Sequence, residues 1–177
     1  MKTDLEQIHG VKLIELHTSH DSRGLFAKLP TISDFPVAEI FFTTSAAGVI
    51  RGLHAQAGPV PCRKLVYCAH GLALDVIIDL RADSPAYGQH ASLMMNPRGP
   101  ILSLPPGVAH GFCALTNRTV MAYATTAPHH PAFDLGVHWA SIGFDWCHEA
   151  DGVFQDFTIS ERDRSLPALK DFATPFL

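Results

Sequence analysis

Short apolar segments recur throughout residues 36–126, and each ends at a turn rich in glycine, proline or asparagine. The segments favour β-branched and aromatic residues, and almost no helical periodicity lies between them. Many short strands at regular spacing predict an antiparallel sandwich or barrel. The segment "LALDVIIDL" (72–80) is apolar on both faces, which is typical of a strand covered on both sides. The predicted strands span residues 39–45, 48–54, 64–68, 72–80, 90–95, 100–104, 111–116 and 119–126.

Helix is predicted only near the C-terminus. In "ISERDRSLPAL" (159–169), Ser160 is a candidate N-cap and Asp163 follows three residues later, a weak capping-box pattern. Residues 127–158 are predicted to form a loop anchored by Trp139 and Trp146. No repeat or low-complexity linker divides the chain. We therefore expect one all-β domain over residues 1–177, with a short C-terminal helical segment.

Charge and composition exclude several classes of protein. The net charge of −4 with no basic stripe disfavours binding to nucleic acid. The apolar runs are too short to span a bilayer, and residues 1–10 lack the apolar stretch of a signal peptide, so we expect a cytoplasmic protein without a membrane partner. The four cysteines lack metal-ligand spacing, and we expect free thiols.

Several polar residues interrupt the apolar segments, where they are costly unless a partner or a polar cavity receives them. Arg51 and His54 stand in "VIRGLHAQ", and Lys64 begins the next segment. His110 precedes a structural break, and Tyr123 lies in "VMAYATT". Each residue alone also fits a structural role, such as a satisfied histidine or a core aromatic with a bonded hydroxyl. The constellation is more informative than any member.

Metal binding is one functional alternative. A metal site in a β-barrel typically uses two histidines that alternate on one strand, then an acid, then a histidine from a later strand. Here Gln56 stands where a second histidine is needed, so His54, Gln56 and His110 make a poor divalent site. The other nine histidines, among them His129, lie in polar or loop contexts and are predicted to be exposed to solvent.

General acid–base catalysis is the second alternative. A histidine with an ordinary pKa of about 6.5 can remove a proton at neutral pH if a carboxylate orients its other ring nitrogen. The reaction also needs a cation to stabilise the resulting anion, and an acid to return a proton. Arg51 and Lys64 can supply the cation, and the phenol of Tyr123 can supply the acid.

These residues lie in segments that resemble the dTDP-4-dehydrorhamnose 3,5-epimerase family, metal-free cupins of deoxysugar biosynthesis. "RGLH" followed ten residues later by a lysine, then by "DVIIDLRADSPAYG" and "PPGVAHGF", is a specific combination. The matching segments run in order over most of the chain: "DSRGLF" (21–26), "VIRGLHAQ" (49–56), residues 63–89, "LPPGVAHGF" (104–112), "AYATT" (122–126) and "ISERDRSLPAL" (159–169).

The resemblance implies a cupin-type jelly-roll fold, a homodimer, no cofactor, and a nucleotide-linked 4-keto-6-deoxyhexose as substrate. His54 then resembles the general base, Asp163 its paired carboxylate, Tyr123 the proton donor, and Lys64 the cation beside the C4 oxyanion. The residues expected to bind substrate are Lys64 together with Arg23, Lys28, Arg51, His110, Asp134 and Arg162, with Asp75 and Gln56 as possible supports.

The implied reaction follows from carbonyl chemistry. A ketone at C4 acidifies the hydrogens on C3 and C5, because the carbanion delocalises as an enolate. His54 would remove such a proton, and Lys64 would stabilise the enolate in a pocket of low dielectric constant. Inversion requires the proton to return on the opposite face, which needs an acid separate from the base. Tyr123 suits that role.

Three departures from the family pattern concern the binding residues. Lys28 stands where an acid is usual, residues 39–41 replace a Gln-Asp-Asn run, and Ala55 replaces an aromatic residue. The sugar, the nucleotide or the number of inverted centres can therefore differ, which leaves a C3-only or C5-only epimerase as an alternative. A metal-dependent cupin isomerase or oxygenase is a further alternative. A non-catalytic binding module is disfavoured, because a binder does not need His54, Asp163 and Tyr123 together.

Overall fold

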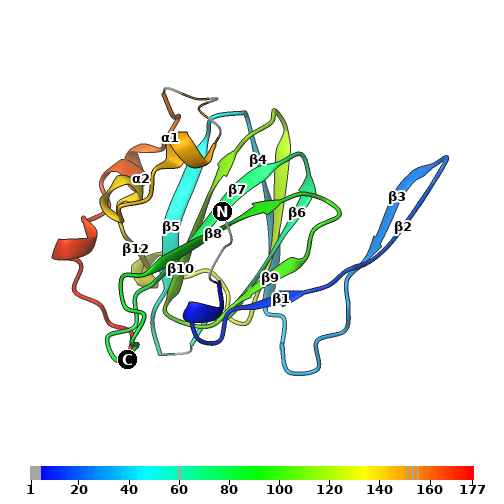
Figure 1. The fold of residues 1–177 in the computed structure, drawn as a ribbon. Coiled ribbons are helices and arrows are strands. Elements are labelled where there is room, and N and C mark those ends of the chain that lie inside the picture. Colours follow the sequence, from blue (N-terminus) through cyan, green and yellow to red (C-terminus); the bar gives the residue numbers. More distant parts are fainter. Residues whose placement is uncertain (1–4, 60, 151, 153, 155) are drawn as a thin grey trace.

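The computed structural model describes residues 5–59, 61–150, 152, 154 and 156–177. Two five-stranded antiparallel sheets face each other, and a separate two-stranded hairpin extends from them (Figure 1). This architecture confirms the prediction of an all-β, cupin-type jelly roll. The first sheet runs in the order β1 (Lys12–Ile14), β9 (Ile101–Leu104), β6 (Lys64–His70), β11 (Thr119–Thr125) and β4 (Glu39–Ser45). The second runs β12 (Asp134–Gly136), β5 (Ile50–Gln56), β10 (Val108–Ala114), β7 (Ala73–Asp79) and β8 (His90–Met95).

The strands predicted between residues 39 and 126 are all present, with β4 and β8 at their predicted bounds. No sequence pattern predicted β1, β12, or the hairpin formed by β2 (His17–Asp21) and β3 (Gly24–Lys28). β1 and β12 have three residues each, too few to show alternation. The hairpin is largely exposed and contains many polar residues, so it lacks the pattern of a half-buried strand.

Two apolar clusters lie on the two sides of the second sheet. The inner cluster fills the space between the sheets and includes Val66, Ile77 and Met121. The outer cluster, which includes Val76 and Trp146, packs the second sheet against the C-terminal segments. Every residue of β7 is consequently buried, as its continuous apolar character predicts. Burial on both faces makes the second sheet the rigid base from which several polar side chains project.

The C-terminal segments cover the outer face of the second sheet (Figure 1). The predicted cap is confirmed: the N–H of Asp163 donates to Ser160 Oγ at 3.1 Å, at the start of α2 (Glu161–Arg164). Residues 127–158 are not wholly a loop, because they contain β12 and the short helix α1 (Trp146–Glu149). The structure also contains short 3-10 turns at Leu5–Gln7, Pro131–Phe133, Trp139–Ser141 and Leu169–Asp171.

Among the described residues, no helix has both the length and the apolar character needed to cross a membrane. The four cysteines, Cys62, Cys68, Cys113 and Cys147, have free thiols.

Candidate active site

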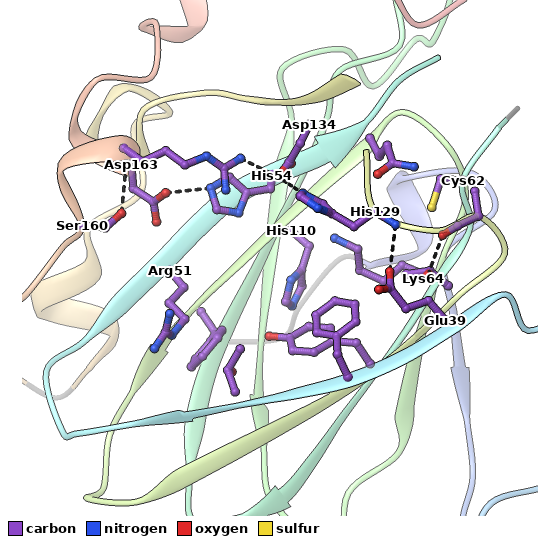
Figure 2. Close-up of a pocket in the computed structure, with 18 residues that line it drawn as sticks. Glu39, Arg51, His54, Cys62, Lys64, His110, His129, Asp134, Ser160 and Asp163 are labelled. Carbon is purple, nitrogen blue, oxygen red and sulfur yellow. Dashed lines mark hydrogen bonds and ion pairs between the residues drawn. The ribbon is translucent and has the colours of Figure 1, made fainter. Parts of the chain in front are cut away.

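A pocket of about 440 Å³ lies between the two sheets, and side chains from both sheets point into it (Figure 2). The second sheet and the segments next to it contribute Arg51, His54, Gln56, His110, Phe112, Asp134, Ser160, Arg162 and Asp163. The first sheet and its flanking segments contribute Glu39, Phe41, Thr43, Cys62, Lys64, Tyr123, Thr125, Ala127 and His129. A pocket of this size is in the range of small-molecule sites.

A bulge in β5 brings Arg51 and His54 to the same face. Side chains three residues apart on a regular strand point to opposite faces. Here His54 pairs with His110 and Arg51 pairs with Phe112, so two β5 residues stand opposite Gly111 alone. One of these two is Gly52, at φ +117°, where a Cβ atom would lie 2.5 Å from the Gly111 Cα. The "RGL" sequence therefore allows the strand to place both polar side chains in the pocket.

His54 is paired with a carboxylate from the other end of the chain. Its Nε2 atom lies 2.8 Å from Asp163 Oδ1, and the Gly52 N–H donates to Asp163 Oδ2 at 3.0 Å. Burial alone favours the neutral acid, but the hydrogen bonds from His54 and Gly52 outweigh it and lower the pKa of Asp163. The carboxylate is therefore charged at neutral pH and orients the imidazole.

His110 and Tyr123 form the deeper part of the site. His110 Nε2 lies 2.6 Å from Asp75 Oδ2, and both residues are buried. The Tyr123 ring meets the His110 ring edge-on, with 5.9 Å between their centroids. Burial, together with the negative charge of Asp75, raises the pKa of Tyr123 far above its usual value. The phenol is therefore protonated at neutral pH and can act as a proton donor.

Lys64 projects into the same space from the start of β6 (Figure 2). Burial lowers the pKa of its ammonium group, and the acidic groups of Cys62, Asp134 and Asp75 oppose that effect. A cation in a low-dielectric pocket stabilises a developing negative charge more strongly than one in water. Lys64 is thus positioned to stabilise an oxyanion on a bound ligand.

The wall near Lys64 contains a polar cluster around Asp134. Asp134 Oδ2 accepts from Arg162 Nη2 at 2.6 Å and from His129 Nε2 at 2.9 Å. Burial opposes ionisation, but the hydrogen bond from His129 and the positive charge of Arg162 lower the pKa of Asp134. The His129 N–H also donates to Glu39 Oε2 at 2.8 Å. His129 is half exposed, as predicted, but sequence reasoning missed its place in the pocket.

Two other predicted residues, Gln56 and Arg51, make hydrogen bonds that join segments around the pocket. Gln56 Nε2 donates to the Pro128 carbonyl, and Gln56 Oε1 accepts from the His130 N–H, both at 3.0 Å. Gln56 therefore fixes the segment that carries His129. Arg51 Nε donates to Ser45 Oγ at 3.0 Å, which links β5 to β4 across the pocket.

Arg23 and Lys28 lie outside this pocket. Both belong to the β2–β3 hairpin, which extends away from the two sheets (Figure 1). The Arg23 side chain is 88% exposed and pairs with Asp21, with 2.6 Å between Nη2 and Oδ2. Within one chain, the hairpin does not bring these two cations to the other predicted site residues. Their assignment to substrate binding stays a prediction.

Within the described part of the chain, no three His, Cys, Asp or Glu side chains are grouped closely enough to hold a metal ion. His54 and His110 face the pocket as neighbours, but each uses Nε2 for a carboxylate. The Gln56 side-chain amide makes hydrogen bonds with the backbone of Pro128 and His130. These contacts fit an acid–base site better than a ligand set for a divalent cation.

Comparison with known proteins places the chain in a family. The family model for dTDP-4-dehydrorhamnose 3,5-epimerase matches residues 6–171. A protein of Sinorhizobium fredii with that name is 34% identical over 177 residues, which is 94% of this chain and 88% of the relative.

Solved structures agree with this match. An epimerase from Mycobacterium tuberculosis has a TM-score of 0.85 at 28% identity, covering 97% of this chain and 90% of that one. A 3'-monoepimerase from Streptomyces bikiniensis, in complex with dTDP-quinovose, has a TM-score of 0.82 at 26% identity, covering 91% and 84%. The chain therefore belongs to the dTDP-4-dehydrorhamnose 3,5-epimerase family.

Proposed function

We propose that this protein is an epimerase that inverts C3, C5 or both centres of a nucleotide-linked 4-keto-6-deoxyhexose in deoxysugar biosynthesis. One observation carries the proposal: His54 and Tyr123 project from strands of opposite sheets into one pocket. A base on one wall and an acid on the other suit removal of a proton from one face of the sugar and its return to the other face.

The tautomer of His54 follows from its partner. A carboxylate only accepts hydrogen bonds, so the imidazole donates its Nε2–H to Asp163 and keeps a lone pair on Nδ1. Nδ1 removes the proton next to the C4 ketone, and the C–H electron pair moves into the enolate. The enolate oxygen gains negative charge, which the Lys64 ammonium stabilises. Asp163 stabilises the imidazolium that forms.

Reprotonation completes the inversion. The phenol of Tyr123 gives its proton to the enolate carbon from the other side, and the C4 ketone re-forms. The phenolate left behind takes a proton from solvent, and the imidazolium loses one, so both residues return to their starting states. The raised pKa of Tyr123 supports this role, because the phenol holds its proton until the basic carbon is presented.

The charged groups near the opening suit the diphosphate of a sugar nucleotide. Arg51 and Arg162 both line the pocket and are exposed to solvent. A planar guanidinium group can donate hydrogen bonds to two phosphate oxygens at once. Arg162 already binds Asp134, so it presents its remaining N–H groups to a ligand from a fixed position.

A homodimer would give Arg23 and Lys28 a place in substrate binding. The projecting hairpin carries Phe26, which is 59% exposed, and the edge strand β4 presents Ile40 and Phe42 to solvent. Exposed apolar groups on an edge strand and on a projecting hairpin support pairing with a second copy of the chain. In such a dimer the hairpin of one chain reaches toward the pocket of the other.

The free cysteines support a cytoplasmic location.

An epimerase that inverts a single centre is the second candidate. Phe41 presents an apolar ring to the pocket, in a segment that departs from the usual family pattern. The proteins of similar structure include one described as a 3'-monoepimerase. A changed wall can alter which carbon approaches the base and the acid, while the acid–base groups themselves are retained.

A substrate panel tests the proposal. The purified protein is incubated with 4-keto-6-deoxyhexoses linked to dTDP, CDP, GDP and UDP, and the configuration at C3 and C5 is read by NMR. We expect inversion with at least one nucleotide, and unchanged turnover after exhaustive chelation. No inversion with any member of the panel would contradict the proposal. Activity that is lost on chelation and restored by a divalent metal would favour the metal-dependent isomerase instead.

A further inference from the structure

Phe41 stacks directly on the proposed proton donor. The two rings lie 4.7 Å apart between centroids, with an interplanar angle of 16°. Phe41 and Tyr123 are also register partners on the neighbouring strands β4 and β11. Cross-strand aromatic pairs of this kind restrict the orientation of both rings.

Phe41 covers one face of the Tyr123 ring. The edge-on contact with His110 limits the phenol on another side, and the His110–Asp75 hydrogen bond holds His110 itself in place. Phe41 is 38% exposed, and it lines the pocket between Glu39 and Thr43 on the same face of β4. Its ring therefore contacts both the donor and the space where the sugar would lie.

We propose that Phe41 is a positioning residue that holds the Tyr123 phenol in line with the enolate carbon and gives the sugar ring an apolar surface to pack on. The inference rests on the proposed epimerase function. The enolate has two fates: protonation by Tyr123 gives the inverted product, and protonation by the His54 imidazolium returns the substrate. Phe41 governs the partition between these fates, since only the first depends on the phenol's position.

The partition can be measured in D₂O. When the imidazolium exchanges its proton with solvent, each return through His54 leaves deuterium in recovered substrate, while each inversion leaves deuterium in product. The ratio of the two is independent of the fraction of folded enzyme, because misfolded molecules contribute to neither. A residue with only a structural role would lower both signals together.

The experiment compares the purified protein with Phe41→Leu, Phe41→Tyr and Phe144→Leu. The leucine keeps an apolar side chain but removes the stacked ring, whereas the tyrosine keeps the ring. Phe144 contacts Trp146 at 5.0 Å in the outer cluster, so Phe144→Leu is a matched loss of an aromatic contact away from the pocket.

For Phe41→Leu we expect the ratio of deuterated substrate to deuterated product to rise about two- to tenfold, the effect of losing one aromatic pair. Phe41→Tyr should keep the ratio within about twofold of the wild-type value, and Phe144→Leu should leave the ratio unchanged. An unchanged ratio in Phe41→Leu, with exchange still present, would overturn the role of Phe41 alone. Absence of deuterium from both pools in the wild type would overturn the epimerase proposal, and the role of Phe41 with it.

Discussion

His54 Nε2 lies 2.8 Å from Asp163 Oδ1, although 109 residues separate the two in sequence. His54 projects from β5, and Asp163 from the short helix α2 that packs beside this strand (Figure 2). The same carboxylate accepts the Gly52 N–H through its second oxygen. Asp163 therefore fixes both the imidazole and the bulge on which the imidazole is carried.

Replacement of Asp163 by asparagine should lower catalysis far more than stability. The amide can still accept from Gly52, but it cannot stabilise an imidazolium, and it can favour the wrong His54 tautomer. We expect the rate of C–H exchange to fall by roughly 10²–10⁴. Glu161→Gln, an exposed carboxylate of the same helix, is the control and should retain the wild-type rate. Equal rates in Asp163→Asn and the control would contradict the pairing.

The bulge makes a separate prediction about Gly52. A Cβ atom at this position would lie 2.5 Å from the Gly111 Cα and 2.7 Å from the His110 carbonyl oxygen, at a φ of +117°. Gly52→Ala should therefore lower the free energy of unfolding by about 2–4 kcal/mol through strain and overpacking.

Gly143→Ala is a matched control for Gly52→Ala. Gly143 also has a positive φ, +74°, but a Cβ atom there would meet nothing within 4 Å. The control should cost about 1–2 kcal/mol from backbone strain alone. Urea denaturation of both variants measures the difference. Equal losses of stability would show that the close approach of β5 to β10 is not a constraint.

Much of the fold could be predicted because its strands carry their own signal. The segment 39–45 shows β propensity between clear turns, and β4 has these bounds. The cap at Ser160 was predictable for the same reason, since the N-cap and the residue it binds are neighbours in sequence. The edge strand β12 was not predictable. Its three residues pair with β5 across about eighty positions in sequence, and no local pattern indicates such a pairing.

Site residues could likewise be predicted only where the local sequence sets them apart from their neighbours. Arg51, His54 and Lys64 are conspicuous because each is a polar residue in an apolar segment. His129 stands in the polar stretch "APHHPAF" and has no such contrast, so only its contacts with Asp134 and Glu39 reveal its place. The hairpin is the reverse case, because its residue was recognisable in the sequence but its position was not predictable. Arg23 lies in a recognisable motif, yet the position of the hairpin relative to the pocket depends on the assembled structure.

The lowered pKa of Asp79 predicts how the free energy of unfolding depends on pH. Its burial favours the neutral acid, but hydrogen bonds from Arg81 and Ser84 outweigh burial and lower its pKa. A carboxylate with a lowered pKa contributes stability above its unfolded pKa of about 3.9, and that contribution disappears as the pH falls through the folded value. Asp79→Asn should therefore cost about 1.5–3 kcal/mol at pH 7 and progressively less below pH ~4.

Asp83→Asn is the control for this effect, because Asp83 is exposed on the neighbouring turn. Urea midpoints of the wild type and both variants, measured from pH 7 down to the acid transition, give the comparison. A destabilisation by Asp79→Asn that stays constant across the whole range would contradict the charge-dependent account.

Tyr123→Phe separates the two proton transfers. The substitution removes only the phenol hydroxyl and keeps the ring contacts with Phe41 and His110. His54 remains able to form the enolate and return the proton, so deuterium should still enter recovered substrate in D₂O. Inverted product should fall by roughly 10²–10⁴, the usual contribution of a general acid. If product forms at the wild-type rate, Tyr123 is not the donor.

Deuterium entry from D₂O into a nucleotide-linked 4-keto-6-deoxyhexose, followed by NMR at C3 and C5, shows whether His54 forms an enolate. We expect deuterium at C3, C5 or both with the wild-type protein, and none above background with His54→Asn. A wild-type protein that inverts a centre without incorporating deuterium, or a His54→Asn variant that exchanges at the wild-type rate, would contradict an enolate formed by His54.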